Sequence, residues 1–161
     1  MEALAISRCS ADSNFFPLFL EGLQGEIGHE SLALQDLNSL GYSIESFPEL
    51  PATSSFYHSL YYFINYESSL SILGYKLPLE GVACQGSQKL LYEKTLKLYG
   101  ESSTSFLKVH DSEDVSHYKQ GLEMLQMCEN KDLSVICKVC QHFSYASRAM
   151  TEAILKKHLN K

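Results

Sequence analysis

Side chains of the types that bind metal ions recur at helical spacing within residues 106–125, FLKVHDSEDVSHYKQGLEML. His110, Asp114 and His117 are four and three residues apart, so a helix places them on one face over two turns. Neutral imidazole and carboxylate groups are ligands that a transition metal such as iron accepts. Neighbouring leucines indicate that this face points toward a packed interior. The alternative is an ordinary ion pair on a solvated helix face, formed by a histidine and an aspartate at helical spacing.

Other acidic residues lie close to these candidates in the sequence. Asp111 and Glu113 flank them but point to other sides of the predicted helix, so we interpret both as solvated rather than as ligands. Glu67, in the segment NYESS, is either a contact outside the ligand set or a surface residue.

A second candidate pair is Glu26 and His29 in the segment GEIGHESLALQDL. A spacing of three puts a carboxylate and an imidazole on one side of a helix, as in the carboxylate di-iron sites of helix bundles. Gly25 and Gly28 accompany the pair, and each glycine inside a helix costs roughly 1 kcal/mol relative to alanine. That cost is understandable where the backbone or a ligand must approach closely. An ordinary exposed pair is the alternative.

Glu80 is a third candidate because it stands in the otherwise apolar segment LPLEGVA. A buried carboxylate without a partner is unfavourable, so Glu80 must either find one or lie at the surface. A metal ion would be such a partner. A turn that leaves Glu80 exposed is the alternative.

The cysteines do not form a recognisable framework. Cys137 and Cys140 form a CxxC pair within the apolar-periodic run LSVICKVCQHF, and no second CxxC completes a four-thiolate zinc site. We therefore interpret the cysteines as small buried core residues rather than as redox or zinc ligands. The set comprises Cys9, Cys84, Cys128, Cys137 and Cys140.

The elements that position these residues are predicted to be helices. After a loose N-terminus, apolar periodicity and capping residues mark successive helical segments, with Gly74 and Pro78 expected to break or kink the chain. No segment has the alternating pattern of a strand. We expect an all-α fold, with one domain over residues 1–161. The predicted helices cover about 14–41, 53–73, 87–100, 104–130 and 133–158.

Composition narrows the class of protein. With 161 residues, 45% of them hydrophobic and 20% charged, the chain is typical of a globular domain. A net charge of −6 without a basic cluster argues against nucleic-acid binding. No apolar run reaches membrane-spanning length, and residues 1–13 lack the pattern of a signal peptide. We therefore expect a soluble, cytoplasmic protein with no membrane partner.

Three sequence elements resemble those of one enzyme family. LGYKLPLEG resembles the LGxLYxLEG element of haem-oxygenase-like proteins. GEIGH-x6-DL-x3-G and FLKVH-x3-D-x2-H resemble two further elements of the haem-oxygenase-like di-iron oxidases, also called iron-containing redox enzymes. The resemblance covers about residues 25–125 and implies a haem-oxygenase-like helical bundle in which three helices hold a dinuclear, non-haem iron site. The metal ligands that it implies are Glu26, His29, Glu80, His110, Asp114 and His117.

The chain also departs from this family. Its members usually have a further pair of helices before the Glu-x-x-His element, whereas this sequence starts near that point. We therefore expect an N-terminally shortened form that completes its bundle as a homodimer, or else a fragment. The tyrosine of the LGxLY element is displaced, with Tyr75 directly after Gly74 and Lys76 next to it.

The resemblance implies an enzyme that uses O2 to oxidise a small amine, amino-acid or fatty-acid-like substrate. It implies no catalytic residue beyond the metal ligands and no organic cofactor. Manganese or a mixed metal pair fits the same ligand types as iron. Two alternatives remain: a haem- or thiamine-related enzyme of the same superfamily, and a non-catalytic helical interaction protein.

Overall fold

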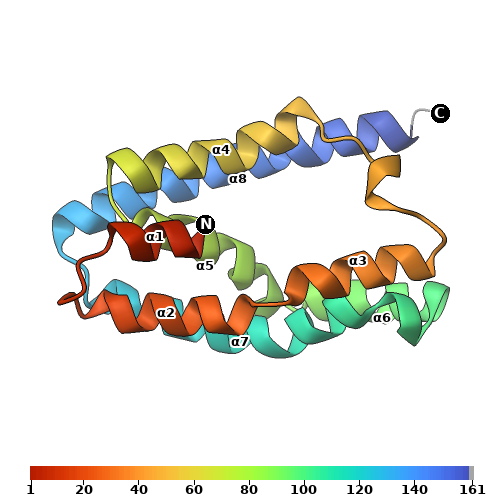
Figure 1. Ribbon diagram of the computed structural model, residues 1–161, viewed down its shortest axis with the longest axis horizontal. Helices are drawn as coiled ribbons and strands as arrows, with labels where there is room; N and C mark the ends of the chain where they lie inside the picture. Colours follow the sequence, from red (N-terminus) through yellow and green to blue (C-terminus); the bar gives the residue numbers. More distant parts are fainter. Residues whose placement is uncertain (160–161) are drawn as a thin grey trace.

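Helix α5 (Ser71–Cys84) is the central element of the computed structural model, which describes residues 1–159 apart from one side chain, at position 83. It contacts α4 and α8 on one side and α7 on the other (Figure 1). No β-strand occurs within the described residues, so the all-α prediction is confirmed. The other helices are α1 (Glu2–Arg8), α2 (Phe15–Glu26), α3 (His29–Ser39), α4 (Pro51–Tyr66), α6 (Ser87–Tyr99), α7 (Ser105–Gln126) and α8 (Asn130–Leu159), with 3₁₀ turns at Ile44–Ser46 and Glu101–Ser103.

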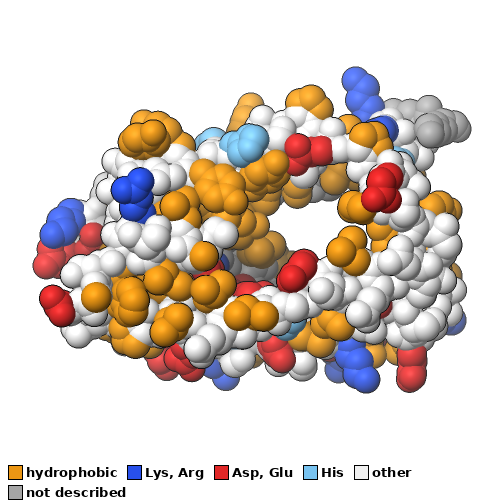
Figure 2. All heavy atoms as spheres, viewed as in Figure 1, with side chains coloured by type: hydrophobic (Ala, Val, Ile, Leu, Met, Phe, Trp, Pro, Cys, Tyr) orange, Lys and Arg blue, Asp and Glu red, His pale blue; other side chains and the backbone are white. Residues whose placement is uncertain are grey.

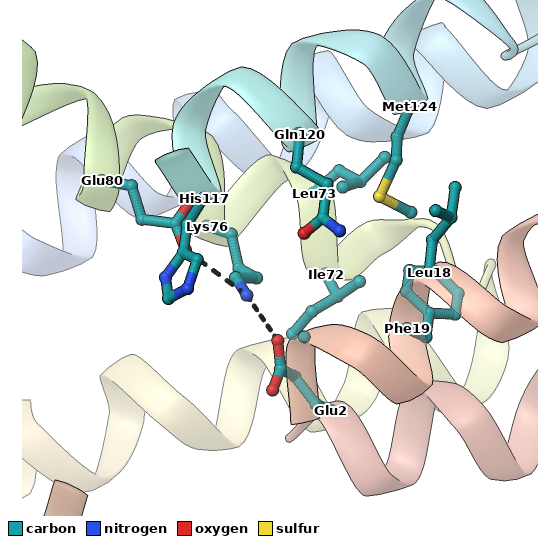
Figure 3. Close-up of a pocket in the computed structure, with 12 residues that line it drawn as sticks. Glu2, Leu18, Phe19, Ile72, Leu73, Lys76, Glu80, His117, Gln120 and Met124 are labelled. Atoms are coloured by element: carbon teal, nitrogen blue, oxygen red, sulfur yellow. Dashed lines mark hydrogen bonds and ion pairs between the residues drawn. The ribbon is translucent and has the colours of Figure 1, made fainter. Parts of the chain in front are cut away.

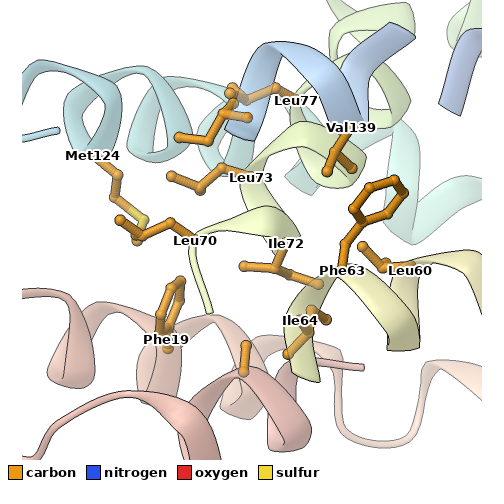
Figure 4. Packing of buried hydrophobic residues seen from close by; sticks show 12 residues of the cluster. Phe19, Leu60, Phe63, Ile64, Leu70, Ile72, Leu73, Leu77, Met124 and Val139 are labelled. Carbon is orange, nitrogen blue, oxygen red and sulfur yellow. The ribbon is translucent and has the colours of Figure 1, made fainter. Parts of the chain in front are cut away.

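The hydrophobic core surrounds the first half of α5 (Figure 4). Ile72, Leu73 and Leu77 of α5 pack against apolar residues from α1, α2, α4, α7 and α8, which keeps these helices in fixed positions. Glu80 lies one helical turn beyond the last core residue of α5, so the core positions the candidate site. The core residues are Ala5, Phe19, Leu60, Phe63, Ile64, Leu70, Ile72, Leu73, Leu77, Met124, Ile136 and Val139.

Close packing between α5 and α8 depends on Gly74. A Cβ atom at this position would lie 2.5 Å from the carbonyl oxygen of Ile136 and 2.6 Å from Cβ of Val139. Of the break or kink predicted at Gly74 and Pro78, the break does not occur, because α5 continues through both residues, and the kink stays a prediction. The chain breaks earlier, between α4 and α5, where the Ser68 side chain accepts a hydrogen bond from the Leu70 backbone in a local turn.

The N-terminal third differs from the prediction in two ways. Residues 2–8 form helix α1, held by the fully buried Ala5, although this segment was expected to be loose. The single helix predicted over 14–41 is two helices, because the chain turns at Gly28, whose φ of +95° is disfavoured for residues with a Cβ atom. The later predicted helices agree with α6, α7 and α8 to within a few residues.

An opening separates two parts of the molecule (Figure 2). The α4/α8 pair lies on one side of it, and α3 and α6 lie on the other (Figure 1). Within residues 1–159, α5 and α1 make the principal contacts to α4 and α8, whereas α3 and α6 pack instead on α7, α5 and the second 3₁₀ turn. In that same range no helix is both long and apolar enough to cross a membrane.

Candidate metal centre

Glu26 and His29 face each other across the turn between α2 and α3. Glu26 is the last residue of α2 and His29 is the first residue of α3, with His29 Nδ1 3.2 Å from Glu26 Oε2. The prediction that both residues share one helix face is therefore wrong. Gly28 reverses the backbone between them, and this turn brings the two side chains together.

The structure groups five of the six expected ligands into two clusters that share Glu26. In each cluster, the potential ligand atoms lie within 4.8 Å of one another. Glu26 uses both oxygens, with Oε2 near His29 and Oε1 3.6 Å from His117 Nδ1. A carboxylate placed in this way has one oxygen close to each cluster. The clusters are Glu26–His29–His110, called the His29 cluster below, and Glu26–Glu80–His117, called the Glu80 cluster.

Asp114, the sixth expected ligand, belongs to neither cluster but lines the cavity beside them. Burial raises the pKa of its carboxyl group above the ordinary value, although His110 and His117 act in the opposite direction. Glu26 raises this pKa further. The charges of residues in both clusters therefore act on the carboxyl group of Asp114.

Glu80 is buried, so the alternative of an exposed turn is wrong. Burial raises the pKa of Glu80 to about 7, even though the Lys76 ammonium group acts to lower it. Lys76 Nζ lies 3.4 Å from Glu80 Oε1 and 2.5 Å from Glu2 Oε1 (Figure 3). Burial alone lowers the pKa of Lys76, but Glu80 and Glu2 outweigh it and hold this pKa above its ordinary value. The Lys76–Glu80 pair was not predicted, although the i,i+4 spacing of the two residues in the sequence indicates it.

Two buried histidine nitrogens of the site form no hydrogen bond. No described protein atom forms a hydrogen bond with His110 Nδ1 or with His117 Nδ1, although the latter lies within ion-pair distance of Glu26 Oε1. Buried polar atoms are normally hydrogen-bonded, so two such imidazole nitrogens next to carboxylates fit a bound cation. Phe106 packs on the His110 ring with ring centroids 4.1 Å apart and limits its orientation.

Glu113 belongs to neither cluster and its side chain is 44% exposed, in agreement with its interpretation as solvated rather than as a ligand, but its contact with His29 was not predicted. Its Oε2 atom lies 3.6 Å from His29 Nε2, on the side of the ring opposite Glu26. Histidines that bind metals commonly direct their second nitrogen to a carboxylate, which fixes the ring. The position of Glu113, three residues after His110, was the signal in the sequence, but only the α3–α7 contact brings it to His29.

Asp36 was also missed, and it positions the start of α7. This buried α3 residue accepts hydrogen bonds from the backbone N–H groups of Ser105 (3.0 Å, to Oδ1) and Phe106 (2.8 Å, to Oδ2). A carboxylate at a helix N-terminus satisfies free donors and complements the helix dipole. The first turn of the helix that carries His110, Asp114 and His117 is therefore held from α3.

A cavity of about 540 Å³ adjoins the two clusters. Its polar wall contains Glu26, Glu80, His110 and Asp114, and its apolar wall includes residues of α2, α5 and α7. A smaller cavity of about 20 Å³ lies near Lys76, Glu80 and His117 (Figure 3). The larger volume is typical of sites for small organic molecules.

The cysteines only partly follow the prediction of a buried set. Cys84 and Cys137 are exposed, which contradicts their assignment to the core. Cys9, Cys128 and Cys140 are half-buried and pack against the core. Burial raises the pKa of the Cys128 and Cys140 thiols, which leaves them less reactive than an ordinary thiol.

Comparisons with known proteins support the fold. The sequence matches no protein-family model, and no curated protein is significantly similar to it. The chain resembles the crystal structure, at 2.30 Å resolution, of a domain of unknown function with a heme oxygenase-like fold from Shewanella denitrificans OS217. The TM-score is 0.80 at 24% sequence identity, over 98% of this chain and 72% of the other. This chain therefore has a haem-oxygenase-like fold, as predicted.

Proposed function

We propose that this chain is an O2-dependent, non-haem di-iron oxidase that acts on a small amine, amino-acid or fatty-acid-like substrate. The observation that carries the proposal is the position of Glu26 between two clusters of ligand-type residues, each of which contains a buried histidine nitrogen without a hydrogen-bond partner. The same three elements of sequence that resemble the di-iron oxidases supply these clusters. The haem-oxygenase-like fold agrees with the proposal but does not by itself define an activity.

In this proposal, each cluster supplies ligands for one of two metal ions. The His29 cluster would hold one ion and the Glu80 cluster the other, with Glu26 shared and Asp114 facing both. Lys76 is paired with one of the three carboxylates, Glu80, and two divalent cations would compensate the negative charge that remains. Ferrous ions bound there would supply electrons to dioxygen and thereby activate it toward the substrate. Manganese or a mixed pair suits the same donors.

The surrounding side chains would orient the ligands and hold the substrate. Glu113 fixes the His29 ring from its second nitrogen, and Phe106 packs on His110. The cavity next to the clusters presents Tyr75, Leu79 and other apolar residues to a bound molecule. These residues reduce the water in contact with the site, which strengthens electrostatic interactions within it.

The direct experiment is an anaerobic titration of metal-free protein with Fe(II), followed by Mössbauer spectroscopy and measurement of O2 consumption. We expect two irons per chain in the wild type and loss of at least one in His110→Ala and in His117→Ala. His58→Ala is the matched control, since His58 is an exposed histidine of α4 that belongs to neither cluster, and it should bind metal as the wild type does.

Three results would contradict the proposal. Protein that binds neither iron nor manganese would favour the non-catalytic interaction protein. A Soret band with axial histidine ligation after addition of haemin would favour haem chemistry. Equal iron binding in the wild type and in both cluster variants would place the metal elsewhere.

A further inference from the structure

Lys76 carries a positive charge next to one of the two clusters. Its side chain is 18% exposed and lies between two carboxylates, Glu80 of the same helix and Glu2 of α1, which are 7% and 12% exposed. Figure 3 shows the ammonium group reaching toward both partners. A buried lysine requires such partners, and here the two carboxylates share one cation.

The two clusters differ in this respect. Glu80 has a lysine within ion-pair distance, whereas within residues 1–159 no lysine or arginine forms an ion pair with a member of the His29 cluster. A dication at the Glu80 cluster would have to approach an ammonium group that already compensates one of its ligands. The repulsion between like charges a few ångströms apart is strong where water is scarce.

Glu2 is a second ion-pair partner of Lys76. The Lys76–Glu2 distance of 2.5 Å is shorter than the Lys76–Glu80 distance of 3.4 Å, so Glu2 is the closer partner. Glu2 belongs to α1, which the fully buried Ala5 anchors to the core. The Glu2 carboxylate therefore remains in place for Lys76 when Glu80 is used by another cation.

We propose that Lys76 is the internal counter-ion of Glu80 in the metal-free chain, and that Glu2 retains Lys76 when Glu80 binds a metal ion. The Glu80 cluster is consequently the weaker site and fills after the His29 cluster. The Lys76–Glu2 pair thus regulates how many ions the site holds. This inference rests on the proposed function, since it requires that both clusters bind metal.

Substitutions of Lys76 and of Glu2 are expected to change the metal affinity of the weaker site in opposite directions. A general structural role of the pair would not produce opposite changes. Lys76→Met removes the repelling charge, so we expect Mn(II) to bind the weaker site about tenfold more tightly or better. In Glu2→Gln, Lys76 keeps Glu80 as its one remaining ion-pair partner. We therefore expect the affinity of the weaker site for Mn(II) to fall about tenfold. The stronger site should change by less than about threefold in either variant.

The measurement is titration of metal-free protein with Mn(II), with free Mn(II) followed by electron paramagnetic resonance. Lys119→Met is the matched control, since Lys119 is an exposed lysine of α7, and its affinities should equal those of the wild type. Circular dichroism verifies that each variant is folded. If Lys76→Met does not fold, the loss in Glu2→Gln alone decides the outcome.

Failure of this inference differs from failure of the proposed function. Two sites of equal affinity in the wild type, or changes of the same sign in Lys76→Met and Glu2→Gln, would overturn the role of Lys76 while leaving the metal centre intact. Wild-type protein that binds no Mn(II) and no Fe(II) would overturn both.

Discussion

The raised pKa of Glu80 predicts a pH dependence of stability in the metal-free chain. The pKa is about 7 in the folded state against 4.5 ordinarily, so the folded state binds the proton more tightly. The protonated Glu80 side chain contributes roughly 3 kcal/mol to the free energy of unfolding below about pH 4.5. This contribution is lost as the pH rises from about 4.5 to about 7. Urea unfolding from pH 4.5 to 8 should show this fall in the wild type.

The matched variant for this measurement is Glu80→Gln, which has the same shape and no titrating proton. The difference in unfolding free energy between wild type and Glu80→Gln should change in favour of the variant as the pH rises through this window. A difference that stays constant from pH 4.5 to 8 would contradict the raised pKa.

At the scale of the elements, the helices themselves were predictable, but their breaks and end contacts were not. Apolar periodicity located α6, α7 and α8 well. The turn at Gly28 and the cap from Asp36 depend on how α3 meets α7, and periodicity carries no such information.

Asp36 gives a prediction at this scale. Asp36→Ala removes the acceptor of two backbone N–H groups at the start of α7 and should lower the free energy of unfolding by about 2–4 kcal/mol. Asp36→Asn keeps the shape and one acceptor oxygen, so it should lose about half as much. Urea unfolding measures both values, and equal losses within error would show that the charged cap contributes nothing.

Gly28 gives a second prediction for the elements. Gly28→Ala should destabilise the chain by about 1–2 kcal/mol, because alanine disfavours the left-handed backbone at a φ of +95°. The comparison is Gly25→Ala within α2, which should be neutral or stabilising by up to about 1 kcal/mol. Thermal or urea unfolding distinguishes the two, and equal effects would contradict the role of the turn at Gly28.

At the scale of the whole molecule, the surface is large for the mass. The accessible surface is 10022 Å², about 1,900 Å² more than the roughly 8,100 Å² expected for a monomeric protein of 18.1 kDa. The opening between the α4/α8 pair and the α3/α6 side contributes to this surface (Figure 2). An excess of this size per chain lies within the range of area that each subunit buries in obligate homodimers.

We therefore predict that the chain forms a homodimer with a second copy seated at the opening. Val82 lies one helical turn beyond Leu79 on α5, is 46% exposed and does not line the cavity that we assign to the substrate, so it is available to a second copy. Light scattering after size exclusion should give twice 18.1 kDa for the wild type and a monomer for Val82→Glu. Tyr145→Glu, at an 80% exposed position of α8 opposite the core residue Ile136, should remain dimeric. A wild-type monomer would contradict the prediction, and dissociation by Tyr145→Glu alone would place the interface elsewhere.

The sequence by itself determined the all-α class, most of the helices and the donor types on α7. These depend on periodicity and spacing within one segment, where helix geometry fixes which residues are neighbours. Only the tertiary structure decided that Glu26 stands between two clusters, that Glu113 faces His29, and that Lys76 compensates Glu80 and Glu2. Those contacts join side chains of different helices, and they follow from the turn at Gly28 and the packing of α5 against α1 and α7, which no local pattern encodes.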